Sequence, residues 1–334
     1  MGFNVCVAGA TGNVGRTMIK ILEERNFPCD RIRFLASSRS AGKKLLYKGT
    51  EITVEELTPD SFEKGELVLS SPGGAVSKWY VPSAVKAGAL IIDNTSAFRM
   101  VEDVPLVVPE VNPEDAFKHK GIIANPNCST IQMVVVLKPL HDAAEIERVV
   151  VSTYQSVSGA GMSAINELRE QSREIIEGKP GTVTVFPYQI AFNCIPQIPQ
   201  KNAFEPNFYS EEEMKMVNET KKIMHAPSIL LTATTVRVPV FVSHAEAVNI
   251  ETKQKLTRDD AIAILSKAPG VTVIDDPSAQ LYPLQTKSTG KDDTFVGRIR
   301  EDISHNRGLV MWVVSDNLRK GAALNAIQIA ELFL

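Results

Sequence analysis

The glycine pattern near the start of the chain restricts the fold more than any other feature. The apolar run Phe3–Ala8 has the character of a buried strand and leads directly into Gly9-Ala10-Thr11-Gly12-Asn13-Val14-Gly15. Apolar residues then recur at helical spacing between residues 14 and 22. Glycines let a backbone turn tightly beside a pyrophosphate, and the N–H groups at a helix amino end attract its charge. This strand–loop–helix context favours a dinucleotide-binding unit over a turn that only packs a helix on a strand.

Strand and helix patterns divide the chain into two parts. Buried strands are predicted in the first part at residues 31–36, 67–70, 90–93 and 122–124. Their alternation with helical patterns is typical of a parallel, doubly wound sheet. Helices are predicted in the second part at residues 131–137, 165–176 and 211–224, and irregular structure at 179–207. Strands are predicted there at residues 149–154, 232–242, 245–252, 294–299 and 309–314. Because few helices separate these strands, a largely antiparallel sheet is expected.

The expected fold class is therefore α/β, with a Rossmann-type doubly wound parallel sheet and a second, α+β domain whose sheet is mixed and largely antiparallel. We predict the first domain at residues 1–128 and the second at 129–314. Apolar residues at helical spacing after Gly321 predict a terminal helix within 315–334, which should return to complete the first domain.

Composition narrows the class of protein. The chain has 334 residues, a net charge of −3 and no long run of one charge, so neither nucleic acid nor a membrane surface is an expected partner. No apolar run approaches the span of a bilayer. The four cysteines show no paired spacing, which favours a reducing, cytoplasmic setting over disulfides or a zinc site. No ligand cluster for any metal is apparent.

The segment after the second predicted strand indicates which dinucleotide is bound. NAD enzymes usually place Asp or Glu there for the ribose hydroxyls. This chain instead has Ser37-Ser38-Arg39-Ser40 followed by Lys43. Hydroxyls and a guanidinium suit a 2′-phosphate, so NADP is the predicted cofactor. The alternative is an ordinary basic surface loop.

Cys128 is the candidate nucleophile. It lies in Asn125-Pro126-Asn127-Cys128-Ser129-Thr130, between a predicted strand and a predicted helix. A helix amino end favours the thiolate, and its N–H groups can hold a developing oxyanion. A buried, structural cysteine is the competing interpretation. That interpretation suits Cys6, inside the first strand, whereas Cys29 and Cys194 lie in segments expected to be loops.

A thiol nucleophile needs a proton-transfer partner, and the chain has five histidines. His119 and His305 lie in charged, loop-like segments, and His225 ends a charged helix. His244 ends a predicted strand and follows Arg237 by seven residues. From these residues alone a structural role is the favoured interpretation of His244.

Eight segments, in order along nearly the whole chain, resemble the aspartate-β-semialdehyde dehydrogenase family, most closely its branch common in Gram-positive bacteria. They are Gly9 to Gly15, Ser37 to Lys43, Asp93-Asn94-Thr95-Ser96-x-Phe98-Arg99, Val107 to Asn112, Asn125-x-Asn127-Cys128-Ser129-Thr130, Tyr154-Gln155-x-Val157-Ser158-Gly159-Ala160-Gly161, Arg237-Val238-Pro239-Val240 and Ser315-Asp316-Asn317. One departure lies beside His244: where the family often has Gly and Ser on either side, this chain has Ser243 and Ala245.

The resemblance implies roles for individual residues. It makes Cys128 the nucleophile, His244 its acid–base partner and Gln155 the residue that orients the substrate. The substrate-binding residues that it implies are Arg237 for the carboxylate, Arg99 for phosphate, and Glu212, Lys215 and Asn127. The cofactor-binding residues that it implies are Gly9, Thr11, Gly12, Asn13, Val14, Gly15, Ser37, Ser38, Arg39, Ser40, Ser71, Gly73, Ser158, Gly159, Gly161 and Asn317.

The resemblance also implies the reaction. L-aspartyl-4-phosphate would be reduced by NADPH to L-aspartate-4-semialdehyde, with release of phosphate, through a cysteine thioester. This step belongs to the aspartate pathway to lysine and diaminopimelate, threonine, methionine and isoleucine. A homodimer formed through the second domain is expected, with a tetramer as the alternative. Competing interpretations are a related reductase such as N-acetyl-glutamyl-phosphate reductase, a cysteine acyltransferase or hydrolase, and a non-catalytic NADP-binding protein.

Overall fold

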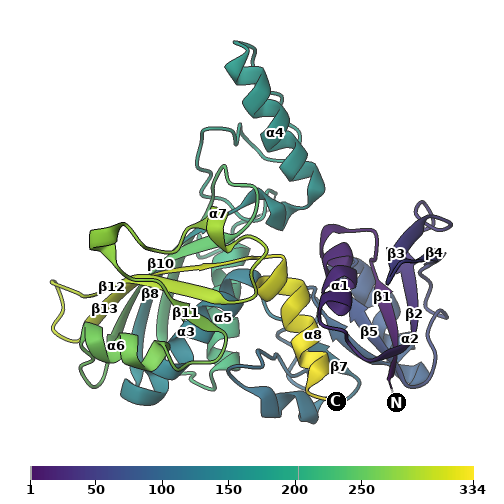
Figure 1. Cartoon of the computed structure of the whole chain (residues 1–334), viewed down its shortest axis with the longest axis horizontal. Helices are drawn as coiled ribbons and strands as arrows, with labels where there is room; N and C mark the ends of the chain where they lie inside the picture. Colours follow the sequence, from purple (N-terminus) through teal and green to yellow (C-terminus); the bar gives the residue numbers. More distant parts are fainter. Residues whose placement is uncertain (1, 202) are drawn as a thin grey trace. The chain divides into compact units, whose positions relative to one another are not determined.

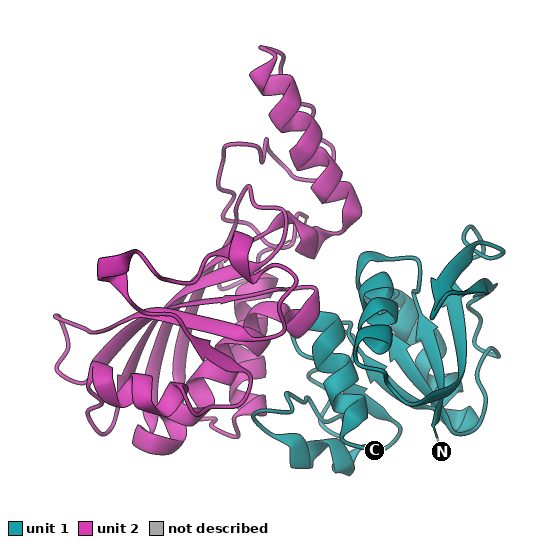
Figure 2. Cartoon of the chain, in the orientation of Figure 1, with its two compact units in different colours: residues 1–127, 322–334 teal, residues 128–321 magenta. Residues whose placement is uncertain are grey.

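The computed structural model describes residues 2–201 and 203–334. They form two compact units, which are coloured separately in Figure 2. Unit 1 comprises residues 1–127 and 322–334, and unit 2 comprises residues 128–321. The predicted domain boundaries differ from these units at residue 128 and over residues 315–321, which belong to unit 2.

Unit 1 contains one seven-stranded sheet in the order β3-β4-β2-β1-β5-β6-β7. The strands are β1 (Phe3–Ala8), β2 (Cys29–Ala36), β3 (Lys44–Tyr47), β4 (Thr50–Glu56), β5 (Glu66–Ser70), β6 (Leu90–Asp93) and β7 (Ile122–Ala124). All neighbours pair in parallel except β3 and β4. The helices are α1 (Asn13–Glu24), α2 (Gly74–Ala87), the 3-10 helix η1 (Pro113–Lys118) and α8 (Leu324–Glu331).

Side-chain alternation in β1 explains why helices cover both faces of this sheet (Figure 1). Val5 and Val7 point into a core shared with α1 and α8. Cys6 and Ala8 point the opposite way, into a core shared with α2. A central strand buried on both sides is the mark of a doubly wound sheet, and the predicted fold class is confirmed. The carboxyl ends of β4, β2, β1 and β5 consequently lie next to one another along one edge.

Unit 2 contains a six-stranded sheet in the order β11-β12-β13-β10-β8-β9. The strands are β8 (Ile146–Gln155), β9 (Leu230–Arg237), β10 (His244–Thr252), β11 (Val271–Val273), β12 (Thr294–Glu301) and β13 (Gly308–Ser315). The outer pairs β11·β12 and β8·β9 are parallel and the three inner pairs are antiparallel, so this sheet is mixed, as predicted. The helices are α3 (Cys128–Ala144), α4 (Met162–Ile176), α5 (Glu211–Ile223), α6 (Arg258–Leu265), α7 (Gln285–Ser288) and the 3-10 helices η2 (Val157–Ala160) and η3 (Pro277–Ala279). The π-helix η4 (Arg319–Ala323) begins in unit 2 and ends in unit 1.

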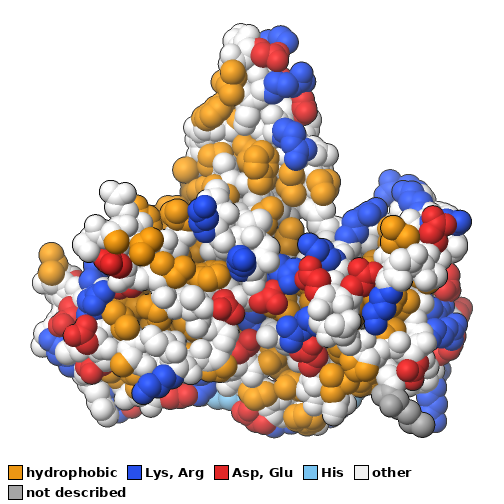
Figure 3. Space-filling model, viewed as in Figure 1, with side chains coloured by type: hydrophobic (Ala, Val, Ile, Leu, Met, Phe, Trp, Pro, Cys, Tyr) orange, Lys and Arg blue, Asp and Glu red, His pale blue; other side chains and the backbone are white. Residues whose placement is uncertain are grey.

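The helix α3 is the central helix of unit 2. It contacts β8, β10, β12 and β13 of the sheet, and also α5 and α6, which themselves contact the sheet at β9 and at β11 and β12. Its apolar residues from Ile131 to Leu137 are all buried, as expected for a helix that packs on a sheet and contacts two further helices. By contrast, α4 projects from the rest of the unit (Figures 1 and 2) and packs on residues of the irregular segment that follows it. Hydrophobic side chains are visible on this projecting part of the unit in Figure 3. The exposed hydrophobic residues of the region include Ile176, Val183 and Tyr188.

Several local predictions were wrong. Residues 44–56 form the hairpin β3–β4, whose turn uses Lys48 and Gly49 at positive φ. Cys29, expected in a loop, begins β2. The strand expected at 232–242 ends at Arg237, because the chain then turns at Pro239, which has no N–H for a ladder. The helix α6 was not predicted, although a capping box of Thr257 and Asp260 begins it.

None of the helices formed by residues 2–201 and 203–334 combines the length and the apolar character that crossing a membrane requires.

Candidate active site

Three strands of unit 2 bring the predicted catalytic side chains to one end of its sheet. Gln155 ends β8 and lies level with Arg237, which ends β9. His244 begins β10, and the pairing of its neighbour Ala245 with Tyr154 sets it level with Gln155. Gln155, Arg237 and His244 are respectively 1%, 3% and 0% exposed. Strand register therefore assembles residues that are far apart in the sequence.

Cys128 is the first residue of α3 and is partly exposed. The helix amino end favours a negative charge on its sulfur. Its neighbour Ser129 accepts a hydrogen bond of 2.8 Å at Oγ from Gln155 Nε2, which fixes the start of α3 against the end of β8. Gly321 lies against Cys128, since a Cβ there would stand 2.9 Å from the Cys128 Cβ. Cys128 is thus held closely, while its side chain stays accessible.

The other cysteines lack this setting. Cys6 is buried in β1, and burial raises the pKa of its thiol well above the ordinary value. Burial also raises the pKa of Cys29. Cys194 is exposed and lies outside the helices and strands. Among the four cysteines, all of which lie in the described part of the chain, Cys128 is the one at a helix amino end, and it interacts electrostatically with Arg237.

His244 is held through one ring nitrogen. Its Nδ1 accepts a hydrogen bond of 3.0 Å from the backbone N–H of Ser156, and the Ser156 hydroxyl also lies 3.0 Å from Nδ1. A neutral ring with Nδ1 as acceptor carries its proton on Nε2. Within the described part of the chain, Nε2 has no hydrogen-bond partner. Burial, reinforced by the positive charge of Arg237, lowers the pKa of His244 to about 3, so the imidazole is neutral at neutral pH.

Arg237 is a buried cation with unused donors. Its Nη1 donates a 2.7 Å hydrogen bond to the Ser156 carbonyl, and its Nε has no partner among the described residues. Burial lowers the pKa of this guanidinium, and the negative charges of Glu212 and Cys128 oppose that effect. A buried N–H without an acceptor costs free energy, so this site is suited to an anion that satisfies it.

Glu212 and Lys215 lie on the face of α5 that reaches the same end of the sheet. Glu212 is buried and accepts a 3.3 Å hydrogen bond from Gln155 Nε2. Lys215 pairs with Glu212 at 3.5 Å and with Glu211 at 2.7 Å. Glu213, in contrast, is used in the capping box with Ser210. Of the three successive glutamates, Glu212 is the one that contacts Gln155.

The cofactor-binding residues predicted in unit 2 surround His244. Ser158 and Asn317 hydrogen-bond to each other, and Asn317 Oδ1 accepts from the Ser156 hydroxyl and from the Ser243 N–H. Gly159 lies beside the reactive groups, because a Cβ there would stand 3.1 Å from Arg237 Nη1 and 3.5 Å from His244 Nε2. Gly161 has a φ of +95° and begins α4.

The glycine loop of unit 1 has the close approaches that its sequence predicts. Gly9 has a φ of +83°, and a Cβ there would lie 2.9 Å from the Ser71 backbone. A Cβ at Gly15 would lie 2.3 Å from the Gly9 carbonyl oxygen, so only glycine lets α1 begin this near the loop. Asn13 and Val14 form the first turn of α1.

A cavity of about 540 Å³ opens at this edge of the unit 1 sheet. It is lined by Gly9, Thr11, Gly12, Ala36, Ser37, Ser38, Arg39, Glu56, Leu57, Ser71, Pro72, Val76 and Trp79. Ser40 lies beside it and accepts long hydrogen bonds from Thr11 and Lys43, and Gly73, with a φ of +100°, caps α2. Glycine backbone, hydroxyls and two cationic side chains suit a dinucleotide phosphate, so these residues fit a nicotinamide cofactor.

Two predicted substrate-binding residues belong to unit 1. Arg99 is buried and donates to the backbone carbonyls of Asn94 and Asn125 at 3.0 and 2.9 Å. Asn127 is buried and directly precedes Cys128 in the chain.

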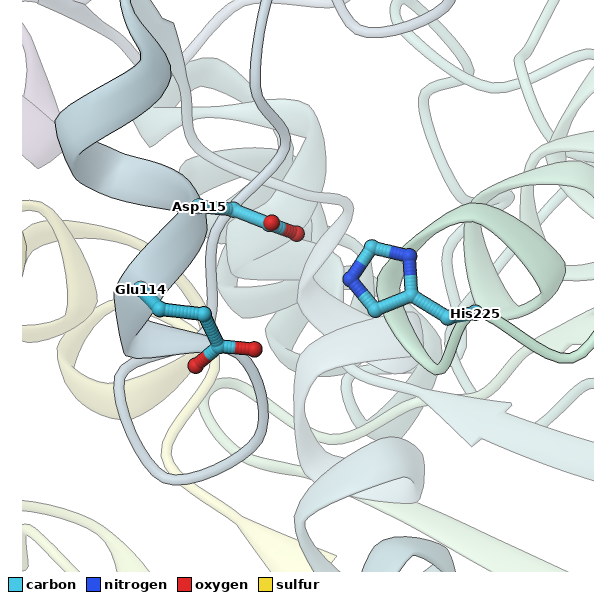
Figure 4. A group of neighbouring side chains, drawn as sticks. All are labelled: Glu114, Asp115 and His225. Atoms are coloured by element: carbon cyan, nitrogen blue, oxygen red, sulfur yellow. The ribbon is translucent and has the colours of Figure 1, made fainter.

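Figure 4 shows three further side chains with metal-ligating atoms. Glu114 and Asp115 lie in the first turn of η1, and His225 follows α5. The first two belong to unit 1 and the third to unit 2, so neither unit contains all three.

Comparisons with known proteins decide the family. Residues 4–119 match the NAD binding domain of semialdehyde dehydrogenase, and residues 137–320 match its dimerisation domain. An aspartate-semialdehyde dehydrogenase of Aquifex aeolicus is 54% identical, over 100% of this chain and 98% of that protein. This chain belongs to the aspartate-semialdehyde dehydrogenase family.

Solved structures of aspartate-semialdehyde dehydrogenases agree with this assignment. The Vibrio cholerae enzyme II, complexed with ASA, has a TM-score of 0.95 and 49% identity, and the match covers 100% of this chain and 98% of that one. The Candida albicans enzyme with NADP has a TM-score of 0.76 and 26% identity, over 100% and 98%. An aspartate-semialdehyde dehydrogenase with this two-unit fold uses a nicotinamide cofactor and a small-molecule substrate.

Sequence reasoning missed three residues that hold the predicted ones. Ser156 contacts both His244 and Arg237, Ser129 contacts Gln155, and Ser243 connects His244 to Asn317. Ser243 has a φ of +76°. Its N–H donates a hydrogen bond to Asn317, and its carbonyl accepts one from Gln285. Its hydroxyl forms a hydrogen bond with the hydroxyl of Thr289. The frequent glycine at this position in the family was the available signal for a left-handed backbone.

Proposed function

We propose that this chain catalyses the NADPH-dependent reductive dephosphorylation of L-aspartyl-4-phosphate to L-aspartate-4-semialdehyde, in both directions, through a thioester on Cys128. The observation that carries the residue assignments is the buried group of Gln155, Arg237 and His244 beside the start of α3. Together with Cys128, this group places a thiol at a helix amino end, a buried guanidinium suited to an anion and an imidazole within one unit.

The first step is attack of the Cys128 thiolate on the acyl-phosphate carbonyl. The carbon–sulfur bond forms, the carbon–oxygen bond to phosphate breaks, and phosphate leaves with the electron pair. Arg237 binds the α-carboxylate of the substrate, because a guanidinium is a planar fork that matches a carboxylate and its Nε has no partner among the described residues. Glu212 receives the substrate amino group, and Gln155 and Asn127 orient the carbonyl. Arg99 and Lys215 bind the phosphate.

His244 supplies the proton that the leaving phosphate needs. The ring is neutral in the structure, since burial and Arg237 depress its pKa. An anionic substrate opposes the charge of Arg237 and raises that pKa, so the ring becomes a proton donor when substrate is bound. The Ser156 hydroxyl, 3.0 Å from Nδ1, can accept the hydrogen bond that a protonated Nδ1 donates. Protonation at Nδ1 would therefore exchange the hydrogen bond from the Ser156 N–H for one to the Ser156 hydroxyl.

When bound, NADPH supplies the hydride that reduces the thioester carbonyl. The residues proposed to hold it are the loop from Gly9 to Gly15, Ser37 to Ser40, Ser71, Gly73, Ser158, Gly159, Gly161 and Asn317. Collapse of the thiohemiacetal then breaks the carbon–sulfur bond, releases the aldehyde and restores the thiolate. The preference for NADP over NAD is attributed to Ser37, Ser38 and Arg39, with Lys43 adding charge.

We further propose that the protein is a homodimer formed through unit 2, with a tetramer as the alternative assembly. The match of residues 137–320 to a dimerisation domain supports this, as do large apolar side chains left exposed there, such as Tyr154, Leu230 and Phe241. Sedimentation of the purified chain tests the assembly.

The reaction is tested by absorbance of the reduced nicotinamide. The purified chain is mixed with aspartate semialdehyde, phosphate and NADP, and parallel reactions omit phosphate or use NAD instead. Reduction of NADP that requires phosphate, or arsenate in its place, supports the thioester route. Equal turnover without phosphate or arsenate would mean that water accepts the acyl group, and no turnover of this semialdehyde would remove the proposal.

A further inference from the structure

One wall of the unit 1 cavity is apolar and is not explained by phosphate binding. It consists of Leu57, Val76 and Trp79. Leu57 is buried in the core between the sheet and α2, and Val76 packs against the same core. Trp79 follows Val76 by three residues on α2, so the two side chains lie on one face of that helix.

Trp79 is unusual because its large ring lines a cavity and is nevertheless 55% exposed. The next residues, Tyr80 and Val81, are fully buried and anchor α2 to the sheet. Trp79 therefore contributes little to the core of unit 1. A flat aromatic ring exposed at a cavity wall is suited to stacking against a flat ligand group.

The other walls indicate which part of a ligand would meet this ring. The loop from Gly9 to Gly12 suits a pyrophosphate, and Ser37 to Arg39 suit the 2′-phosphate of a ribose. In NADP the ribose that carries the 2′-phosphate also carries the adenine base. If Ser37 to Arg39 bind that phosphate, the base is separated from them by this one ribose. Leu57 directly follows β4, which pairs with β2, the strand that ends before Ser37. The apolar wall is thus next to the ribose position along the edge of the sheet.

We propose that Trp79 stacks on the adenine base of the bound cofactor, with Leu57 and Val76 completing the wall, and that it sets much of the affinity for the adenosine half. This inference rests on the proposed binding of NADP in the unit 1 cavity. It assigns to Trp79 a role in ligand affinity and none in the chemistry at Cys128.

Two fragments of NADP separate the adenosine half from the rest. Binding of 2′,5′-ADP and of nicotinamide mononucleotide is measured by calorimetry for the full chain and for the variants Trp79→Ala and Trp79→Phe. We expect Trp79→Ala to raise the Kd for 2′,5′-ADP about tenfold, the size of one base stack, and Trp79→Phe to raise it less than about threefold. The Kd for nicotinamide mononucleotide should not change. The melting temperature should stay near that of the wild type, because the ring is exposed.

Fluorescence gives an independent readout, since the chain has two tryptophans. Trp312 lies in unit 2, where its ring contacts Tyr154 and its Nε1 donates to the Pro283 carbonyl. In a Trp312→Phe chain, Trp79 is the only tryptophan, and 2′,5′-ADP should quench its emission. In a Trp79→Phe chain, the emission of Trp312 should not respond.

The outcomes distinguish this inference from the proposed function. If the wild type binds 2′,5′-ADP and Trp79→Ala binds it equally well, the stacking role is wrong and the cofactor site stands. If Trp79→Ala weakens both fragments equally, the ring supports the whole cavity and the stacking role is again wrong. If the wild type binds neither NADPH nor 2′,5′-ADP, the proposed cofactor site fails, and the role of Trp79 fails with it.

Discussion

The candidate cofactor cavity of unit 1 and the candidate reaction site of unit 2 differ in the kinds of chemical groups that form them. In unit 1, backbone glycines, short hydroxyls and an exposed arginine line an open cavity. In unit 2, the side chains of the site are buried, and they are Gln155, Glu212, Arg237 and His244. A phosphate can be bound by backbone N–H groups and partly solvated charges. Activating a thiol and an imidazole requires desolvated charges that shift each other's ionisation.

The difference also determines what a substitution does. Residues in the unit 1 cavity act largely one by one on ligand affinity, because water screens them from each other. Residues in the unit 2 site share partners, as Ser156 does with both His244 and Arg237, so their effects should be coupled. The predictions below test this contrast.

The largest expected effect is that of Cys128→Ser. Turnover should fall by at least about 10³-fold, since a hydroxyl is a far weaker nucleophile than a thiolate. Binding of NADPH, measured by calorimetry, should be unchanged because unit 1 holds the cofactor loop. The control is Cys194→Ser, an exposed cysteine whose loss should leave turnover intact. A Cys128→Ser enzyme with substantial activity would remove the covalent route.

Arg237→Lys should have the next largest effect. A single ammonium cannot replace the planar fork, and the Ser156 carbonyl loses its donor, so kcat/KM for the semialdehyde should fall about 10²-fold. The KM for NADP should change little. Arg300→Lys, at an exposed arginine of the same unit, serves as the matched control. Unchanged kinetics in Arg237→Lys would exclude the carboxylate clamp.

Arg39→Ala should lower the preference for NADP over NAD about tenfold or more, because one charged hydrogen bond to the 2′-phosphate is lost. The measurement is the ratio of kcat/KM for the two cofactors. The kcat with saturating NADP should persist, in contrast to the unit 2 variants. Lys44→Ala, an exposed cation on β3, provides the control. An unaltered ratio would mean that Ser37 to Arg39 form an ordinary basic surface loop with no role in cofactor selection.

His244 should make the folded state less stable as the pH falls. Its pKa is lowered to about 3 from an ordinary value of 6.5. Between these two values the unfolded chain binds a proton that the folded chain refuses, so the free energy of unfolding decreases as the pH falls through this window. Denaturant unfolding of the wild type and of His244→Asn should show a shallower pH dependence for the variant.

Ser243 should give the smallest effect. Its φ of +76° favours glycine, while its hydroxyl bonds Thr289. Ser243→Gly should therefore be more stable than Ser243→Ala by about 1 kcal/mol, since only the alanine retains the backbone strain. Both lose the hydroxyl contact, so the comparison isolates the strain. Melting curves measure it, and equal stabilities would mean that the strain is negligible.

Local patterns were enough to predict unit 1 in outline, because a strand, a glycine loop and a helix that follow one another also lie together. Cys128 was found for the same reason, as it lies at a strand-to-helix junction. The hairpin of residues 44–56 was missed because its strands are short and mostly polar on the exposed side. The end of β9 at Arg237 was also missed, although Pro239, which has no N–H for a ladder, was a local signal for it.

The support of His244 lay beyond sequence reasoning for a related reason. The Ser156 N–H that fixes the ring comes from a residue 88 positions away, and any non-proline residue there could donate the same bond. The resemblance to a family supplied the role of His244, but the low pKa follows from burial and from Arg237, which only the fold brings together.

The contact of Gly321 with Cys128 bears on whether unit 2 can be excised from the protein by engineering. These are the two end residues of unit 2, and each joins directly to unit 1. Within unit 1, the Asn125 side chain donates a 3.3 Å hydrogen bond to the Ala322 carbonyl. The two segments of unit 1 that lead into unit 2 therefore also lie close together. Unit 2 is therefore a single insert whose two ends meet, the arrangement that tolerates excision and transplantation. Splicing Asn127 to Ala322 through a short bridge should leave a small, free-standing nucleotide-binding protein.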